Sequence, residues 1–375
     1  MSKPTVAILA DFPAFLADAS LPKPQGHYAV WLAALFSALE NQDEFEIHWI
    51  VLSKDVSAPR YVEAKNQHIH ILPRARKTIG LYTLYLLDRW RVARILEQIR
   101  PDLLHAWGSE DCYAYCGRFF EGKKLLSIQG ILTSYMQRGA MSSFHRRHSR
   151  YELPSIRAYR HVTTESPWAA DRINELVPGR ILHHLEYAVE DVFFATPRRM
   201  SARPCVLFAG SDTPIKNLPV LLKAFQDPRL SGITLKLAGI SPDHHPGLPA
   251  NIQALGRVSR QGMTSLLAET WCLVHPSLAD TGPTIVKEAR VMGVPVVLSS
   301  ECGSKQHVRE GKSGFVLEPH DTEGFIQSLL QVCASRETAE QMGVCDQEAC
   351  RKALCSTTMR AELLELYREL LSETS

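Results

Sequence analysis

The chain has 375 residues, of which 45% are hydrophobic and 22% are charged, enough apolar sequence for two domains with separate cores. The formal net charge of +2 excludes a global field that would recruit nucleic acid or anionic lipid. No apolar stretch approaches the roughly 18 residues of a membrane span and the first is too short for a signal peptide, so we expect a cytoplasmic protein, or one held peripherally at the inner face of a membrane.

Short apolar strands alternate with helical patterns through the first half of the chain. Helices are predicted from about residue 27 to 40 and from 82 to 99, and a strand–helix–strand unit over 161–187. The strands expected before that unit are Thr5–Leu9, Glu46–Leu52, His68–Leu72, Leu103–Ala106 and Leu125–Ile128.

The segment 190–204, with two prolines and three arginines, is predicted to be a linker, because the alternation restarts after it. The strands expected there are Cys205–Ala209, Thr234–Ala238, Cys272–His275 and Val294–Ser299, with helices from Asn217 and over Met359–Leu371. Two such runs predict two doubly wound, Rossmann-like α/β domains, at 1–189 and 205–355, followed by a helix in 356–375. Ligands bind at the carboxyl ends of parallel strands, so we expect a cleft between the domains.

Residues 270–319 carry the most chemical information. A buried strand ends at His275, a loop follows, and a helix is predicted to start near Thr284 and Ile285. The first turn of a helix presents unpaired backbone N–H groups, which bind diphosphates well. Gly282 lets the backbone approach a phosphate, and Pro283 suits a helix start. This pattern predicts a diphosphate site.

Two acids and one lysine extend this prediction. Glu288 lies about one turn inside the helix, where a carboxylate could accept both ribose hydroxyls, and Asp280 lies in the loop where a transferred sugar would be. Lys216 follows a strand that ends at Gly210 and could reach the diphosphate. The structural alternatives are a helix-capping Asp280, a surface Glu288 and a solvated Lys216.

These residues resemble the retaining GT-B glycosyltransferases of family four, the group 1 type, over most of residues 205–319. The resemblance implies the GT-B fold, two Rossmann-like domains facing an interdomain cleft, and a nucleotide-sugar donor. Asp280 and Glu288 stand at the positions of the family's two acids, and Lys216 matches its diphosphate-binding lysine. The family's usual arginine after the strand glycine is replaced by Ser211 and Asp212, for which Arg257 is a candidate substitute, and Gln306 replaces an acid.

The N-terminal half resembles the family less. Gly26 is what remains of the Gly-rich loop that faces the donor phosphates, and Gln129 occupies the position of a histidine held to contact the transferred sugar. Glutamine forms hydrogen bonds but does not titrate, so no catalytic histidine is carried over to that position. Gly130 and His105 are candidate acceptor contacts, although a histidine at a strand end is more often structural.

Two further stretches have both a structural and a functional interpretation. Residues 144–161 are basic and rich in histidine, and residues 81–90 are apolar and aromatic. The first is expected to be a solvated helix face and the second part of the core. The alternative is contact with an acidic acceptor or a membrane surface.

Several rival classes lack their motifs. No Asp-x-Asp occurs, and the pairs His183-His184 and His244-His245 lack further ligands, so we expect neither metal nor cofactor. Dinucleotide and P-loop motifs are also absent. The resemblance implies a retaining transfer of sugar from a UDP- or GDP-type donor, and the missing Asp-x-Asp predicts that it is metal-independent. We expect the acceptor to be a hydroxyl of a glycan, a lipid-linked or a small molecule, in cell-surface glycan or glycolipid assembly. A nucleotide-sugar epimerase and a non-catalytic nucleotide-binding scaffold remain as alternatives.

Overall fold

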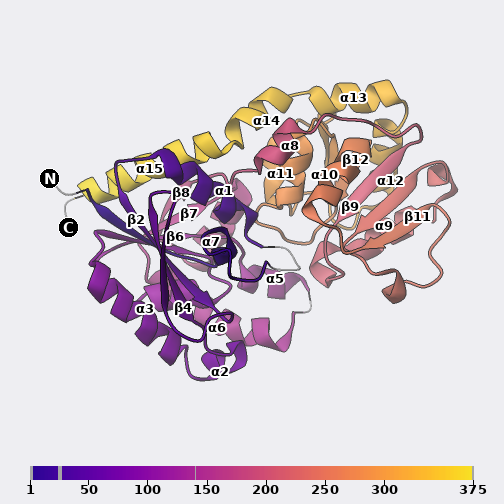
Figure 1. The fold of residues 1–375 in the computed structure, drawn as a ribbon. Helices are drawn as coiled ribbons and strands as arrows, with labels where there is room; N and C mark the ends of the chain where they lie inside the picture. Colours follow the sequence, from indigo (N-terminus) through magenta and orange to yellow (C-terminus); the bar gives the residue numbers. More distant parts are fainter. Residues whose placement is uncertain (1–2, 24–27, 140, 374–375) are drawn as a thin grey trace.

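The computed structural model describes residues 3–23, 28–139 and 141–373, which form two α/β domains side by side (Figure 1). The first sheet has the order β3-β4-β2-β1-β5-β6-β7-β8, and every pair is parallel except β3 with β4. Its strands are β1 (Thr5–Leu9), β2 (Glu46–Ser53), β3 (Arg60–Ala64), β4 (Gln67–Pro73), β5 (Leu103–Trp107), β6 (Lys123–Ser127), β7 (His161–Thr164) and β8 (Ile181–His184).

Helices cover both faces of this sheet. They are α1 (Val30–Ala38), α2 (Lys77–Tyr82), α3 (Leu86–Ile99), α4 (Cys112–Gly117), α5 (Leu132–Arg138), α6 (Ser143–Arg157) and α7 (Pro167–Leu176), with 3-10 turns η1 (Ala14–Leu16) and η2 (Leu39–Asn41). Residues 6–9 of the central strand β1 are fully buried, because parallel strands covered on both faces need continuous apolar runs.

The second sheet is entirely parallel, with the order β11-β10-β9-β12-β13-β14. Its strands are β9 (Cys205–Ala209), β10 (Thr234–Ala238), β11 (Ile252–Gly256), β12 (Cys272–His275), β13 (Val296–Ser299) and β14 (Gly314–Leu317). Its helices are α8 (Asp191–Ala195), α9 (Leu218–Ala224), α10 (Arg260–Glu269), α11 (Thr284–Val291), α12 (Thr322–Val332), α13 (Arg336–Val344) and α14 (Gln347–Ala353), with 3-10 turns η3 (Pro214–Lys216), η4 (Pro228–Leu230), η5 (Pro242–His244) and η6 (Gly303–His307).

The last helix, α15 (Ser356–Ser372), returns from the second domain along the first (Figure 1). Met359, Leu363 and Tyr367 are buried in the core that also holds β1, β2 and α1. Lys123 donates to the carbonyl oxygens of Leu370 and Leu371 at 2.9 and 2.7 Å. The end of the chain is therefore part of the N-terminal domain.

Three sequence expectations need correction. The helix predicted over 82–99 begins only at Leu86, as α3, because Leu84 and Tyr85 adopt left-handed backbone conformations that separate it from α2. The predicted linker contains α8, whose Phe193 is fully buried in the C-terminal domain. The antiparallel edge strand β3 was not expected, because its mostly exposed residues form no apolar run.

Candidate functional site

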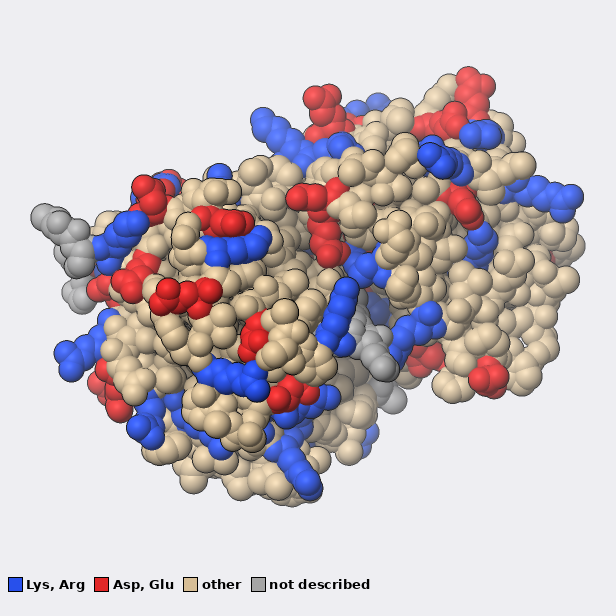
Figure 2. Space-filling view, viewed as in Figure 1, with Lys and Arg blue, Asp and Glu red and all other residues tan. Residues whose placement is uncertain are grey.

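A cavity of about 620 Å³ lies between the two domains, at the carboxyl ends of strands from both sheets. Lysine and arginine side chains border the hollow between the domains (Figure 2). The C-terminal domain contributes Ala209, Gly210, Ser211, Lys216, Ala238, Gly239, Arg257, Val258, Arg260, Met263, His275, Asp280, Thr281, Gly282, Pro283, Thr284, Ile285 and Glu288; the N-terminal domain contributes Trp31, Gln129, Glu165 and Tyr187.

Lys216, Asp280 and His275 form a connected group in this cavity. The ammonium of Lys216 lies 2.5 Å from Asp280 Oδ2, and His275 Nε2 lies 3.0 Å from the same oxygen. Burial alone would raise the pKa of the Asp280 carboxyl, but Lys216 and His275 hold that pKa well below its usual range. Burial lowers the pKa of His275. The group therefore consists of a carboxylate and an ammonium beside a neutral imidazole.

The amino end of α11 opens into the same cavity. Pro283 is its N-cap residue and provides no side-chain cap, so the backbone N–H groups of the first turn keep their capacity to bind an anion. Gly282 packs directly against the Glu165 carboxyl group, and a Cβ added at Gly282 would lie 2.3 Å from Glu165 Cδ. Glycine is thus required here for the contact between the domains.

Glu288 lies one turn further along α11, where it is 2% exposed. Its carboxylate accepts a hydrogen bond from Arg260 at 2.8 Å, and Arg260 also donates to Glu190 at 2.8 Å. Burial raises the pKa of Glu288, and Arg260 opposes this shift. Arg260 therefore orients the acid that is predicted to hold a ribose.

The opposite wall comes from the N-terminal domain. With its amide oxygen turned toward the indole, Gln129 accepts from Trp31 at 2.8 Å and donates to Glu110 at 3.2 Å. Desolvation raises the pKa of Glu110 to about 8. Burial likewise raises the pKa of Glu165 to about 7, although its ion pair with Lys287 acts in the other direction.

The loop before α11 is fixed to the N-terminal domain. Thr281 donates from its hydroxyl to the Gln129 carbonyl at 2.7 Å, and the Ser166 hydroxyl donates to the Thr281 carbonyl at 2.6 Å. A Cβ on Gly303 would lie 1.7 Å from that same Thr281 oxygen, so this close packing requires glycine. The two walls of the cavity are thereby held at a defined separation.

Most of the residues singled out from the sequence line this one cavity. They are Gln129, Gly210, Lys216, Arg257, Asp280, Gly282, Pro283, Thr284, Ile285 and Glu288. Gly26 lies outside the described residues. Gln306 does not line the cavity, but donates to the Glu165 carbonyl at 3.1 Å across the domain contact.

The two candidate acceptor residues are not placed to contact an acceptor. His105 is fully buried in β5, where its two ring nitrogens lie 2.7 Å from the hydroxyls of Tyr367 and Ser127. Burial also lowers the pKa of His105 to about 3, so it remains a neutral structural residue. Gly130 is buried beneath the Tyr135 ring and does not line the cavity. His105 is therefore a residue of the core, and Gly130 lies outside the wall of the cavity.

Three further residues of the site were missed. Glu165 precedes the helix α7 and Arg260 opens α10, and neither stands in a pattern that distinguishes it from a surface charge. His275 is the last residue of β12, and ligands bind at the carboxyl ends of strands in this fold. Of the three residues, only His275 therefore had a position in the sequence that indicated a role in the site.

The two facing parallel α/β domains, with the site between them, define the class as the GT-B fold. Residues 191–345 match the family described as glycosyl transferases group 1. The predicted resemblance to that group and the predicted GT-B fold are both confirmed.

Similar proteins are glycosyltransferases. The D-inositol 3-phosphate glycosyltransferase of Streptomyces griseus is 28% identical over 156 residues, which are 36% of this chain and 33% of that protein. The lipopolysaccharide core biosynthesis glycosyltransferase LpsE of Rhizobium meliloti is 23% identical over 227 residues, 56% of this chain and 64% of that protein. The matches thus span between a third and two thirds of these curated relatives.

Solved structures match the whole fold. Sucrose-phosphate synthase from Thermosynechococcus elongatus superposes with a TM-score of 0.80 at 15% identity and full coverage of both chains. Anabaena Alr3699/HepE in complex with UDP-glucose has a TM-score of 0.69 at 13% identity, covering 97% of this chain and 99% of that one. Within the described residues, no helix is long and apolar enough to cross a membrane.

Proposed function

We propose that this chain is a retaining, metal-independent glycosyltransferase that moves a sugar from a UDP- or GDP-type donor to a hydroxyl acceptor. The proposal rests on one observation. Lys216 and the start of α11, which has no side-chain cap, lie in the same interdomain cavity. An ammonium and the amino end of a helix are complementary to a diphosphate. HepE, whose fold this chain shares, binds UDP-glucose in its solved structure.

In the proposed reaction, the bond between the sugar and the diphosphate breaks, the acceptor oxygen bonds to the same face of the sugar, and the acceptor hydroxyl passes its proton to the departing diphosphate oxygen. Negative charge grows on the departing diphosphate, where Lys216 and the α11 amides stabilise it. Glu288, oriented by Arg260, holds the ribose hydroxyls, and Asp280 contacts the sugar. Asp280 also keeps Lys216 in place until the donor binds.

The arrangement of charge supports the proposed metal independence, because Lys216 and the helix start can supply the positive charge that a divalent ion supplies in other transferases.

Thermal shift with UDP, GDP, ADP and their sugar conjugates tests donor binding. A ligand at 100 times its dissociation constant should add roughly 2.7 kcal/mol of stability. We expect stabilisation by one base class, and loss of that effect in Lys216→Ala. Turnover with the identified donor, followed by assignment of the anomeric configuration of the product, tests retention; an inverted product would contradict it. Undiminished turnover after extensive chelation would support metal independence.

The same assay separates the two alternative classes. A nucleotide-sugar epimerase would convert the sugar of the donor without any acceptor product. A non-catalytic scaffold would bind nucleotide and turn over no donor. The substitutions that favour the scaffold are Gln129 in place of a histidine, and Ser211 and Asp212 in place of an arginine.

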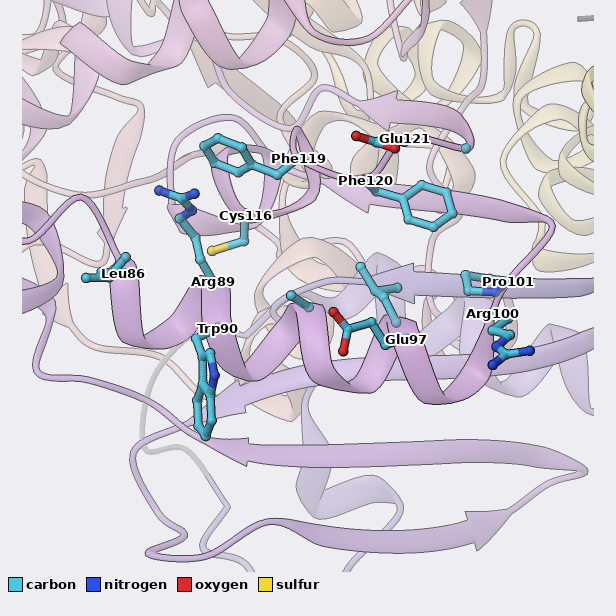
Figure 3. A pocket seen from close by; sticks show the side chains of 13 residues that line it. Leu86, Arg89, Trp90, Glu97, Arg100, Pro101, Cys116, Phe119, Phe120 and Glu121 are labelled. Carbon is cyan, nitrogen blue, oxygen red and sulfur yellow. The ribbon is translucent and has the colours of Figure 1, made fainter.

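We further propose that the N-terminal domain contacts an anionic membrane that carries a lipid-linked acceptor. An apolar groove of about 700 Å³ lies between α3 and the segment with Phe119 and Phe120. Figure 3 shows side chains that line it, among them Leu86 and Trp90 of α3. Apolar side chains are exposed at and beside it: Ile79, Tyr82, Leu84, Leu86, Leu87, Trp90 and Phe119. Arg89 lies 3.5 Å over the Phe119 ring, and Arg147 lies 4.2 Å over Tyr82. Such interleaving of basic and apolar groups suits an anionic bilayer interface.

Vesicle sedimentation tests this contact. The full chain should bind vesicles that contain anionic lipid more strongly than neutral ones, and less well as salt rises. Replacing Leu86 and Trp90 by serine should abolish binding, whereas Val344→Ser, at an equally exposed apolar site of the other domain, should not. Equal binding by all three proteins would rule out this surface.

A further inference from the structure

A group of histidine and carboxylate side chains lies on the outer strands of the first sheet. In the strand register, His48 of β2 is paired with His68 of β4, and His68 is paired with Glu63 of β3. Successive side chains of a strand alternate between faces, so Glu46 and His48 project from the same face of β2. β2 begins at Glu46, so the group lies at the end of the sheet opposite the donor cavity.

Three potential ligand atoms converge there. Glu46 Oε1 lies 3.1 Å from His48 Nε2 and 3.6 Å from His68 Nε2, and the ligand atoms of the three residues lie within 4.8 Å of one another. A tetrahedral zinc site with bonds of about 2.0–2.1 Å separates its ligand atoms by about 3.4 Å. The side chains thus already hold nearly the spacing that a metal ion requires.

The surrounding groups orient both imidazoles for metal binding. His48 Nδ1 lies 3.0 Å from His70 Nε2, and His68 Nδ1 lies 2.6 Å from the Tyr61 hydroxyl, which donates to Glu63 at 2.6 Å. In the structure His48 Nε2 donates to Glu46 Oε1 at 3.1 Å, and a metal ion would replace that proton. With both Nδ1 atoms then protonated, the two Nε2 lone pairs would face the ion beside Glu46. Metal-binding histidines are oriented in this way by carboxylates and other acceptors behind them.

We propose that Glu46, His48 and His68 bind one divalent transition-metal ion of the zinc class, with water in the remaining position. Two imidazoles and a carboxylate suit zinc better than magnesium or calcium, which prefer oxygen ligands. The ion joins β2 to β4 near the edge of the sheet, where β3 completes the supporting shell through Tyr61 and Glu63. The site is thus a structural one, separate from the donor cavity.

Isothermal titration of the chelator-treated, untagged full chain with zinc chloride tests this proposal. We expect one ion per chain, and a loss of affinity of more than about tenfold in His48→Ala, His68→Ala and Glu46→Gln. His183→Ala is the matched control, because His161 and His183 also stack across neighbouring strands, with ring centroids 5.4 Å apart. Zinc binding should be unchanged in that control.

Cobalt substitution gives a second measurement. Four-coordinate Co²⁺ bound at this site should produce a strong visible absorption band in the wild type and the control, and not in the His68→Ala chain. Far-UV circular dichroism checks that each variant is folded. If the histidine variants do not fold, the zinc affinity of Glu46→Gln, which preserves the size of the side chain, tests the proposal. Zinc affinity that is equal in Glu46→Gln and the wild type, or a wild-type chain that binds no zinc, would overturn the proposal.

Discussion

In the proposed mechanism, Lys216 contacts both Asp280 and the diphosphate of the donor. Its ammonium is bound to Asp280, so a donor would have to share that charge with the carboxylate. The pair lies in a largely buried site where removing one partner leaves the other charge uncompensated. Effects on catalysis and on stability must therefore be separated by a second substitution.

We expect Lys216→Ala to lower kcat by about 100-fold, because the charge on the departing diphosphate loses its main partner. The change should also destabilise the fold, since Asp280 stays buried beside a neutral His275. Adding Asp280→Asn should restore stability but not turnover. Steady-state kinetics and urea denaturation measure both effects, with the exposed Lys223→Ala on α9 as control. Near-normal turnover in Lys216→Ala would remove its assigned role.

Glu288→Gln tests the ribose contact. Arg260 keeps its bond to Glu190, so the variant should fold normally. We expect a rise of about tenfold in the Kd for the free nucleoside diphosphate, which is ~1.4 kcal/mol, because an amide accepts the ribose hydroxyls less strongly than a carboxylate. Calorimetric titration measures this, with Glu269→Gln at the far end of α10 as control. An unaltered Kd would refute the contact.

At the scale of elements, the loop before α11 takes part both in the proposed donor site and in the contact between the two domains. The sequence places Gly282 and Pro283 at a helix start, and the structure adds that Glu165 of the other domain packs against this glycine. The close contact brings a carboxyl group with a raised pKa to the edge of the donor cavity. The glycine therefore packs the two domains together at the point where the sequence predicts that the backbone approaches a phosphate.

We expect Gly282→Ala to destabilise the protein by about 1–3 kcal/mol, because its Cβ would overlap the buried Glu165 carboxyl group. Donor affinity should fall as well, since the loop must move to relieve the overlap. Thermal denaturation and nucleotide titration measure the two effects. Gly232→Ala is the control, because a Cβ there meets no atom within 4 Å. If both variants behaved like the wild type, the packing role of Gly282 would be refuted.

At the scale of the whole molecule, charged contacts hold the two domains together. Lys287 of α11 pairs with Glu165, and His307 of η6 lies 3.2 Å from Glu186 Oε1. Although burial opposes a positive charge on His307, hydrogen bonds with Cys350 and Glu186 raise the pKa of His307 to about 9. The stability of the domain contact should therefore depend on pH.

A histidine whose pKa is raised on folding stabilises the protein fully below its unfolded pKa of about 6.5. That contribution is lost as pH rises through about 9, so we expect the wild type to lose on the order of 2 kcal/mol relative to His307→Gln over this window. Urea denaturation of both proteins from pH 6 to pH 9.5 measures it. Glu165 titrates in an overlapping pH range in both proteins. The contribution of His307 is therefore measured by the difference between the two curves of unfolding free energy against pH. Parallel curves would contradict the prediction.

The sequence by itself determined the two α/β domains and many of the C-terminal residues that line the interdomain cavity. The apolar runs of β1 and β9 are local patterns that require burial on both faces, and the loop and helix at 278–291 place Asp280, Gly282 and Glu288 within a few residues of one another. Such features are readable because the residues that form them are neighbours in the chain.

The tertiary structure alone decided the contacts between segments distant in sequence. It placed Arg260 on Glu288, Glu165 against Gly282, and His105 inside the first core rather than in the cleft. It also brought Glu46 and His48 of one strand beside His68 of another. No local pattern encodes these pairings, because sheet register and domain packing result from the summed burial of many side chains across the whole chain.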